Sequence, residues 1–265
     1  MKADVVVSTV ALSFDGGKIT PLTCSVAGGE TCDGTALAAV AACQGHQACD
    51  GTTLDIPSEA LDRPGGYGIP ALLDAAEGAT TDGRVMRVSL HPALPYRVVA
   101  ATIYTLALAG HEDLDLVGLD PRWIRDGKLR YRPPRRNGAT SSGGRSPSVT
   151  ITLSHQGVLE LSTNAPDVDS KTLYPNDYGV DLPGLQRWLA ALPEQLTAPN
   201  VDLVVAAASD IRWGTLARVV AVTRERLPDR GYAYLGALES AVAKQVTGDN
   251  RRPLLRRLVF AVAPE

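Results

Sequence analysis

The sequence predicts an α/β protein of the two-layer α+β kind, with two tandem small mixed β-sheets that are each covered by two helices. Two observations predict this class. Short β-branched, alternating runs are interspersed with amphipathic runs along the chain. In addition, a hairpin, a helix, a strand, a helix and a strand occur in the same order on both sides of a basic segment. Strand–helix–strand units require parallel or mixed pairing, with the helices covering the sheet.

The first half, residues 1–120, begins with a predicted β-hairpin. Residues 5–14 (VVVSTVALSF) form a β-branched alternating run, and Asp15-Gly16-Gly17 supplies the turn before residues 18–22. The elements expected next are a helix that contains Leu72, Leu73 and Ala76, a strand at 84–90, a helix at 96–108 and a strand at 114–119.

The second half, residues 149–265, repeats this order. Its hairpin combines residues 149–153 and 158–161 around a turn that ends in Gln156-Gly157. Leucines at 182, 185, 189 and 192 share one helix face. The remaining elements are a strand at 201–207, a helix at 213–223 and a strand at 258–263.

Three segments lie outside this repeat. Residues 24–49 form a Cys-rich insertion in the first half. Residues 121–148 hold eight basic residues and one acidic residue with no apolar period, which favours a basic Pro/Gly linker. Residues 226–250 form an insertion in the second half, and its stretch 232–246 favours an extra helix.

All four cysteines lie between residues 24 and 49. An even number in one loop-rich stretch predicts two disulfides and an oxidising compartment. Residues 35–42 favour a helix with Asp33 or Thr35 as its N-cap, and this helix would separate Cys32 from Cys43 by about 16 Å, too far for a bond. Two pairings stay open: Cys24–Cys32 with Cys43–Cys49, which is favoured, and Cys24–Cys43 with Cys32–Cys49.

Charge and hydropathy limit the class of partner. The net charge is −3 and the pI is near 5.8, which argues against a globally basic nucleic-acid-binding domain. No apolar run approaches the roughly 18–20 residues that span a bilayer. The N-terminus leads directly into a strand-like run, so no signal peptide is expected in this chain.

A search for catalytic patterns finds none that is specific. The four histidines show no HExxH spacing, and the chain has no GxSxG elbow and no GxxxxGK[ST] loop. His91 and His155 are expected to face solvent at a strand end and in a hairpin turn. Cys43, His46 and Cys49 could supply three zinc ligands, but the CxxC spacing common in structural zinc sites does not occur. We therefore predict no enzyme, no cofactor and no metal.

Tyr96 and Trp213 each begin the second predicted helix of their half. The simpler interpretation places them in the core or in a staple at the helix start. The alternative is a partner contact, in which these aromatic side chains form the rim of a sheet edge that pairs with an extended peptide. Both interpretations stay open at the level of sequence.

Residues 82–120 show a strand, a turn, an aromatic residue, a helix with paired aliphatic residues, Ala-Gly and a strand with Leu-Val. These features are Tyr96, Val98-Val99, Ala109-Gly110 and Leu116-Val117, and the second half offers Trp213, Leu216 and Val219-Val220. The pattern resembles the periplasmic domain of the ExbD/TolR family of biopolymer-transport proteins, and it covers most of both halves. It departs from the family at His91 and Ala208, where members often carry Asp, and it shows no counterpart of their transmembrane helix.

The resemblance implies a non-enzymatic periplasmic module of an energised cell-envelope transport or motility complex. Such a module would bind protein partners or peptidoglycan, and two domains in tandem would mimic the dimer that the family forms. Two alternatives stay open: an uncharacterised cell-envelope hydrolase, and a zinc-stabilised cytosolic interaction protein that uses Cys43, His46 and Cys49.

Overall fold

The computed structural model describes residues 3–26, 30–42, 52–63, 66–79, 85–111, 113–117, 128–131, 147–177, 179–198, 201–224, 237–238, 241 and 257–262. The chain divides into two compact units. The first unit comprises Met1–Leu119, Asp126–Pro133 and Ser209–Leu216, and the second comprises Asp120–Arg125, Pro134–Ala208 and Ala217–Glu265. Both units combine helices with mixed sheets, which confirms the predicted α/β class.

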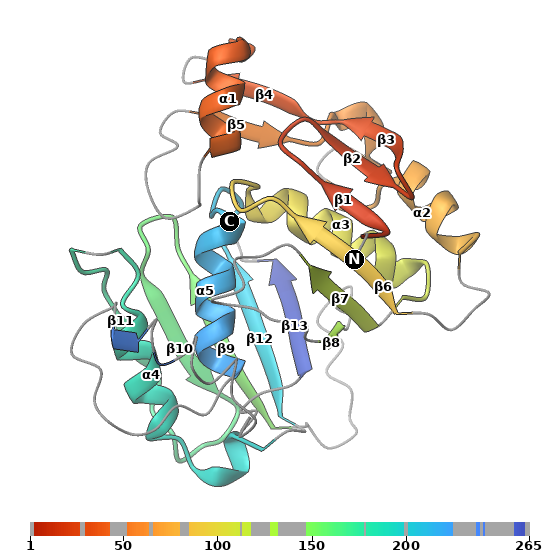
Figure 1. Ribbon diagram of the computed structural model, residues 1–265. Coiled ribbons are helices and arrows are strands. Elements are labelled where there is room, and N and C mark those ends of the chain that lie inside the picture. Colours follow the sequence, from red (N-terminus) through yellow and green to blue (C-terminus); the bar gives the residue numbers. More distant parts are fainter. Residues whose placement is uncertain are drawn as a thin grey trace. The chain divides into compact units, whose positions relative to one another are not determined.

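The first unit contains a mixed sheet with the strand order β8-β7-β6-β1-β2-β3 (Figure 1). Its three central strands run parallel, whereas β2, β3 and β8 pair antiparallel with their neighbours. The strands are β1 (Val5–Val7), β2 (Ala11–Phe14), β3 (Gly17–Pro21), β6 (Met86–Leu90), β7 (Asp113–Val117) and β8 (Lys128–Tyr131).

The predicted run at 5–14 is two strands, because a serine turn interrupts it. The Ser8 hydroxyl accepts hydrogen bonds from the backbone N–H groups of Val10 and Ala11, at 3.3 and 3.1 Å. Such local side-chain bonds compete with the sheet ladder. The predicted turn between β2 and β3 is present, with φ of 47° at Asp15 and 86° at Gly16, as a tight primed hairpin turn requires.

Helices α2 (Pro70–Glu77) and α3 (Tyr96–Leu108) complete the main layer of the first unit. Buried and half-buried residues alternate along β6, so one face of the sheet packs into the core. Thr105 of α3 accepts a hydrogen bond from the Ile69 N–H at 3.0 Å, which ties the start of α2 to α3. His111 contacts the Ala76 carbonyl at 3.1 Å near the end of α2.

The structure extends the Cys-rich insertion to residues 23–55, and the insertion contains more regular structure than the sequence predicts. β4 (Thr23–Val26) and β5 (Thr52–Asp55) form a two-stranded antiparallel sheet. Helix α1 (Gly34–Ala42) matches the expected helix. Asp33 rather than Thr35 caps it, since the Asp33 carboxylate accepts from the Ala36 N–H at 2.8 Å. A short 3-10 helix, Ser58–Ala60, follows.

The second unit contains a sheet with the order β11-β10-β9-β12-β13. Here β9, β12 and β13 run parallel, and the hairpin strands β10 and β11 pair antiparallel. The elements are β9 (Ser148–Leu153), β10 (Leu159–Thr163), β11 (Lys171–Leu173), α4 (Leu182–Ala190), the 3-10 helix Glu194–Leu196, β12 (Asp202–Ala207), α5 (Trp213–Arg224) and β13 (Arg257–Val262). The first four residues of α5 belong to the first unit.

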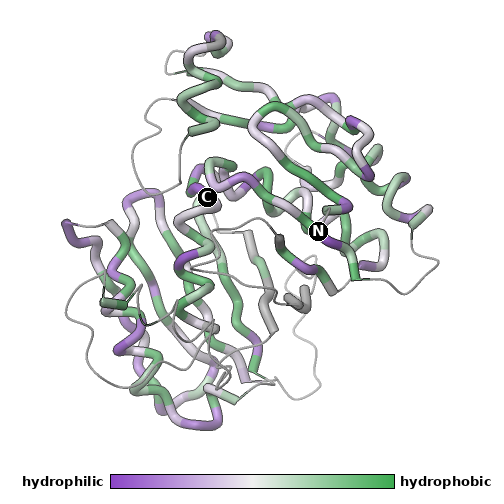
Figure 2. The backbone as a smooth tube through the Cα atoms, viewed as in Figure 1, coloured by the Kyte–Doolittle hydropathy of each residue, from purple (hydrophilic) through white to green (hydrophobic). Residues whose placement is uncertain are grey.

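The two sheets share one topology. In each, an antiparallel hairpin strand flanks three parallel strands, in the orders β2-β1-β6-β7 and β10-β9-β12-β13. Hydrophobic residues dominate these parallel strands, and Figure 2 draws β1 and β12 largely in green. Parallel strands buried on a helix-covered face favour such aliphatic runs.

Two predicted segments lie largely outside the described residues. Of the expected linker, the structure describes β8 and residues 147–148, and β8 pairs with β7. Of the expected helix at 232–246, it describes helical backbone at residues 237, 238 and 241. Within the described ranges, no helix is both long enough and apolar enough to cross a membrane.

Candidate functional site at the turn after β6

The carboxyl ends of parallel strands are the usual ligand-binding edge of an open α/β sheet. In the first unit β6 ends at Leu90, and the chain then turns through His91 and Pro95 into α3. The His91 N–H donates to the Val7 carbonyl at 2.9 Å, so this turn sits beside the end of β1. The polar groups around this turn are therefore the first candidates for a functional site.

His91 uses both ring nitrogens. Its Nδ1 accepts a hydrogen bond from the Ala93 N–H at 3.2 Å, and its Nε2 lies 3.1 Å from the Ala41 carbonyl near the end of α1. A backbone N–H can only donate, so Nδ1 carries no proton and Nε2–H is the donor to Ala41. Burial lowers the pKa of His91 below its usual 6.5, although the bond to Ala41 acts in the opposite direction. The expectation of a solvent-facing side chain is thus wrong for His91, which is half-buried, and correct for His155, which is exposed.

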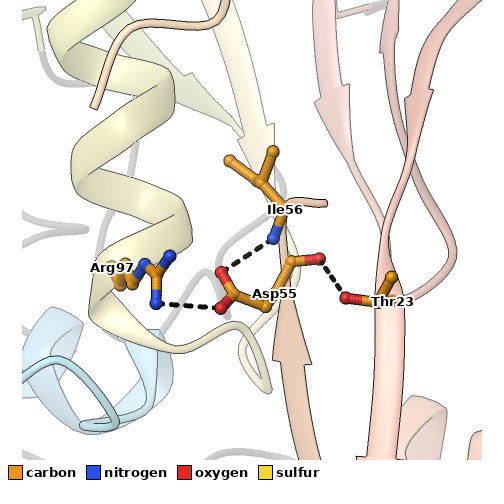
Figure 3. Close-up of polar contacts among 4 residues, drawn as sticks. All are labelled: Thr23, Asp55, Ile56 and Arg97. Carbon is orange, nitrogen blue, oxygen red and sulfur yellow. Dashed lines mark hydrogen bonds and ion pairs between the residues drawn. The ribbon is translucent and has the colours of Figure 1, made fainter. Parts of the chain in front are cut away.

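Asp55 joins the Cys-rich insertion to α3 (Figure 3). Its carboxylate lies 3.0 Å from the Arg97 guanidinium and accepts from the Ile56 N–H at 2.8 Å. The Thr23 hydroxyl donates to the Asp55 carbonyl at 3.2 Å. Both charged side chains of this pair are about one-third exposed, so the pair contributes little more than positioning.

Arg212 supplies a second connection to the insertion. Its guanidinium donates to the Ala93 carbonyl at 2.8 Å and to the Thr52 carbonyl of β5. A guanidinium carries several donors in a fixed plane, which suits it to bridging two carbonyl groups. Arg212 therefore links the turn after β6 to the start of β5.

The starts of α3 and α5 cap each other through backbone groups. The N–H groups of Tyr96 and Trp213 donate to the Ile211 and Leu94 carbonyls, each at 2.7 Å. Two further bonds, Arg97 N–H to the Ser209 carbonyl at 3.0 Å and Gly214 N–H to the Pro92 carbonyl at 2.8 Å, complete a reciprocal set. All these residues belong to the first unit. The first N–H groups of a helix lack partners within it, and α3, whose N-cap is Pro95, has no side-chain cap.

This capping decides the environment of Tyr96 and Trp213. Tyr96 is 2% exposed and Trp213 is fully buried. The structure therefore corrects the interpretation of these two side chains as a partner-contact rim and agrees with a core position. Because both rings are buried, they do not form an exposed edge.

The structure joins Cys24 to Cys32, with Cα atoms 5.3 Å apart. This bond excludes the pairing of Cys24 with Cys43. Cys43, His46 and Cys49 lie outside the described residues, so a second disulfide and the zinc alternative stay predictions. Among the described residues, no group of three His, Cys, Asp or Glu side chains is placed to hold a metal ion.

The polar groups around the turn after β6 are engaged in holding the fold. His91, Arg97 and Arg212 bind the insertion through Ala41, Asp55 and Thr52. The arrangement can position the insertion on the carboxyl edge of the sheet. Sequence reasoning missed Asp55 and Arg97, because an exposed charge on a helix or strand carries no signal of its partner in the chain.

The sheet of each unit also ends in an edge strand. In the first unit, β3 is protected: Lys18 is exposed, a bulge interrupts the register, and Pro21 lacks an N–H donor. In the second unit, β11 is followed by Tyr174, whose side chain is 72% exposed. We call Lys171–Leu173 together with Tyr174 the β11 edge.

Comparison of the chain with protein-family models, curated proteins and solved structures finds no match.

Proposed function

We propose that the chain is a non-enzymatic periplasmic module of an energised cell-envelope complex of the ExbD/TolR type, and that it binds a protein partner. The observation that carries the proposal is the repeated sheet, because each copy ends in a strand that is paired on one side in the described structure. Edge strands can accept an extended peptide through main-chain hydrogen bonds. The resemblance seen in the sequence supplies the type of complex.

The β11 edge suits strand addition better than β3 does. An extended partner gains main-chain bonds along the edge and side-chain contacts with groups that flank it. Lys171 and Thr172 are exposed, and Tyr174 offers an aromatic surface with a polar tip. Both edges carry an exposed lysine, but the bulge and Pro21 of β3 act against pairing on that side.

The disulfide supports a periplasmic location. Disulfides persist in oxidising compartments and are rare in the cytosol. Cys24 and Cys32 lie at bonding distance in the described structure.

The test is site-specific photo-crosslinking in the cell. A photo-reactive amino acid is placed at Thr172 in the full chain, with Leu108, which is 49% exposed in α3, as the control position. We expect a crosslink to an envelope protein from position 172 and a several-fold loss of this product when Tyr174→Ser is added. Absence of a crosslink, or a product unaffected by Tyr174→Ser, would contradict partner binding at this edge. A chain found only in the cytosolic fraction would contradict the location.

Peptidoglycan is a second candidate partner, favoured by the polar face of the second sheet. Its central strands place Thr150 beside Ser162 and Thr152 beside Glu160, and Thr172 continues the second row. These side chains are half-buried or exposed and offer hydroxyl donors and acceptors to a glycan. Sedimentation with purified cell-wall sacculi tests this candidate. We expect the wild-type chain to sediment with the sacculi and Thr152→Val to lose this sedimentation. A wild-type chain that stays in the supernatant would contradict peptidoglycan binding.

A further inference from the structure

Helix α1 is held at both ends by groups of different chemistry. At its start, Cys32 is bonded to Cys24 of β4. At its end, the Ala41 carbonyl accepts from His91 Nε2 at 3.1 Å. The first attachment is covalent, and the second depends on the protonation state of an imidazole.

The bond between Ala93 and His91 makes the second attachment sensitive to protonation. In the neutral ring Nδ1 accepts from the Ala93 N–H at 3.2 Å. In the imidazolium both nitrogens are donors, so an N–H group would face another N–H group. The ring must then turn away from Ala93, and this movement takes Nε2 away from the Ala41 carbonyl.

The charged side chains on the surrounding elements are Arg212, Arg97 and Asp55. The Arg212 guanidinium binds the carbonyl of Ala93, two residues beyond His91. On α3, Arg97 is paired with Asp55 of β5 at 3.0 Å, so two cations accompany one anion. Helix α1 itself (GTALAAVAA) carries no ionisable side chain. Burial favours the neutral ring and lowers the pKa of His91, and it outweighs the bond to Ala41, which acts in the opposite direction.

We propose that His91 is a pH-dependent latch, which holds the end of α1 against the turn after β6 when its ring is neutral and releases it in mild acid. The disulfide keeps the start of α1 in place in both states, so the release is confined to the end of the helix. The latch does not depend on the proposed partner or location.

The direction of the pH effect follows from the lowered pKa. Between the pKa of the folded chain and that of the unfolded chain, the unfolded chain binds more protons, so stability rises with pH. The contribution of His91 is complete above about pH 6.5, the usual value. It declines as the pH falls toward the folded-state pKa.

Hydrogen exchange measured by mass spectrometry tests the latch on the oxidised full chain. Protection factors, corrected for intrinsic exchange, are compared at about pH 7.5 and about pH 5, on either side of the usual histidine pKa. We expect protection of residues 34–42 to fall several-fold at the acid pH in the wild type. In His91→Gln, whose amide can both accept and donate without titrating, protection should be the same at both values. His155→Gln, which removes an exposed histidine in the second unit, should behave as the wild type.

Two results would overturn the proposal. One is an equal fall in protection in His91→Gln and the wild type. The other is a wild type whose protection of residues 34–42 is unchanged by pH. A second measurement needs no variant: NMR titration of the His91 ring nitrogens should show a midpoint that coincides with the loss of α1 protection. If the ring titrates while α1 protection stays constant, His91 is not a latch.

Discussion

The two units build the same sheet, yet the matching helices α2 and α4 begin in different ways. In the second unit the Asp181 carboxylate caps α4 by accepting from the Gly184 N–H at 2.9 Å. In the first unit α2 has no side-chain N-cap of its own, and the Ile69 N–H donates to Thr105 on α3. One cap lies three residues away in sequence and the other 36. The repeat therefore preserves topology while the bonds that complete it differ.

The half-buried faces of the two sheets differ as well. The first sheet carries an ion pair, in which the Arg87 Nε lies 3.5 Å from the Asp115 carboxylate. At the corresponding strands, β12 and β13, the second sheet places the aliphatic residues Val204 and Val259 in register. The buried residues of the parallel strands are hydrophobic in both units. The core thus constrains both copies alike, whereas the other face is left to vary.

The largest expected effect tests whether the start of α5 is part of the core of the first unit. Trp213→Ala should lower the free energy of unfolding by roughly 3–5 kcal/mol, because it removes a fully buried aromatic ring. Urea denaturation under oxidising conditions measures this change. Leu108→Ala, at a position that is 49% exposed, is the control and should cost far less. Equal costs would show that Trp213 is not a core residue.

The next effect tests the long-range cap of α2. Thr105→Val should cost roughly 1–3 kcal/mol, because it leaves the buried Ile69 N–H without its acceptor. The same denaturation experiment measures it. Thr23→Val, which removes an exposed hydroxyl, is the matched control. A loss no greater than the control's would mean that α2 is capped in another way.

The local cap of α4 should be worth less than the long-range cap of α2. Asp181→Ala should cost about 1 kcal/mol, the usual value of an N-cap, and Asp181→Asn should retain most of the stability. Gly184→Ala should reproduce the loss, because a Cβ there would overlap the Asp181 carboxylate. Asp177→Ala, in the exposed loop before the helix, is the control. Stability that is unchanged in Asp181→Ala would remove the contrast between the two units.

The smallest effect concerns the pair between β5 and α3. A double-mutant cycle of Asp55→Asn and Arg97→Gln should give a coupling energy of about 0–1 kcal/mol, and high salt should reduce it. Asparagine keeps an oxygen that can accept from Ile56, so the cycle isolates the charge. A coupling energy well above this range, or one that is insensitive to salt, would mean that the ion pair is more shielded from solvent than the exposure of its side chains indicates.

The elements that were predicted well are those with a strong local pattern. The helix expected at 96–108 has those bounds in α3, and the strand expected at 201–207 begins one residue later in β12. Helix α1 was anticipated together with its Asp33 cap as one of two options. Periodicity and caps act over a few residues, so they can be recognised before the fold is known.

The missed strands are short and depend on a distant partner. Strand β4 is four residues long and pairs with β5, which follows it after α1, and β11 has three residues that pair with β10. Neither has an alternating run long enough to stand out. The sequence does not predict that the first strand splits at Ser8. The Ser8 hydroxyl accepts from the Val10 and Ala11 N–H groups only once the chain has turned there.

The fold class, the repeated order of the elements and the hairpin at Asp15-Gly16 follow from the sequence alone, because hydrophobic period and turn chemistry are local properties. The tertiary structure decided the environment of particular side chains. It buried Tyr96 and Trp213, gave both nitrogens of His91 a partner, and joined Arg212 to Thr52 across 160 residues of chain. Contacts of this kind form only when segments far apart in sequence fold together.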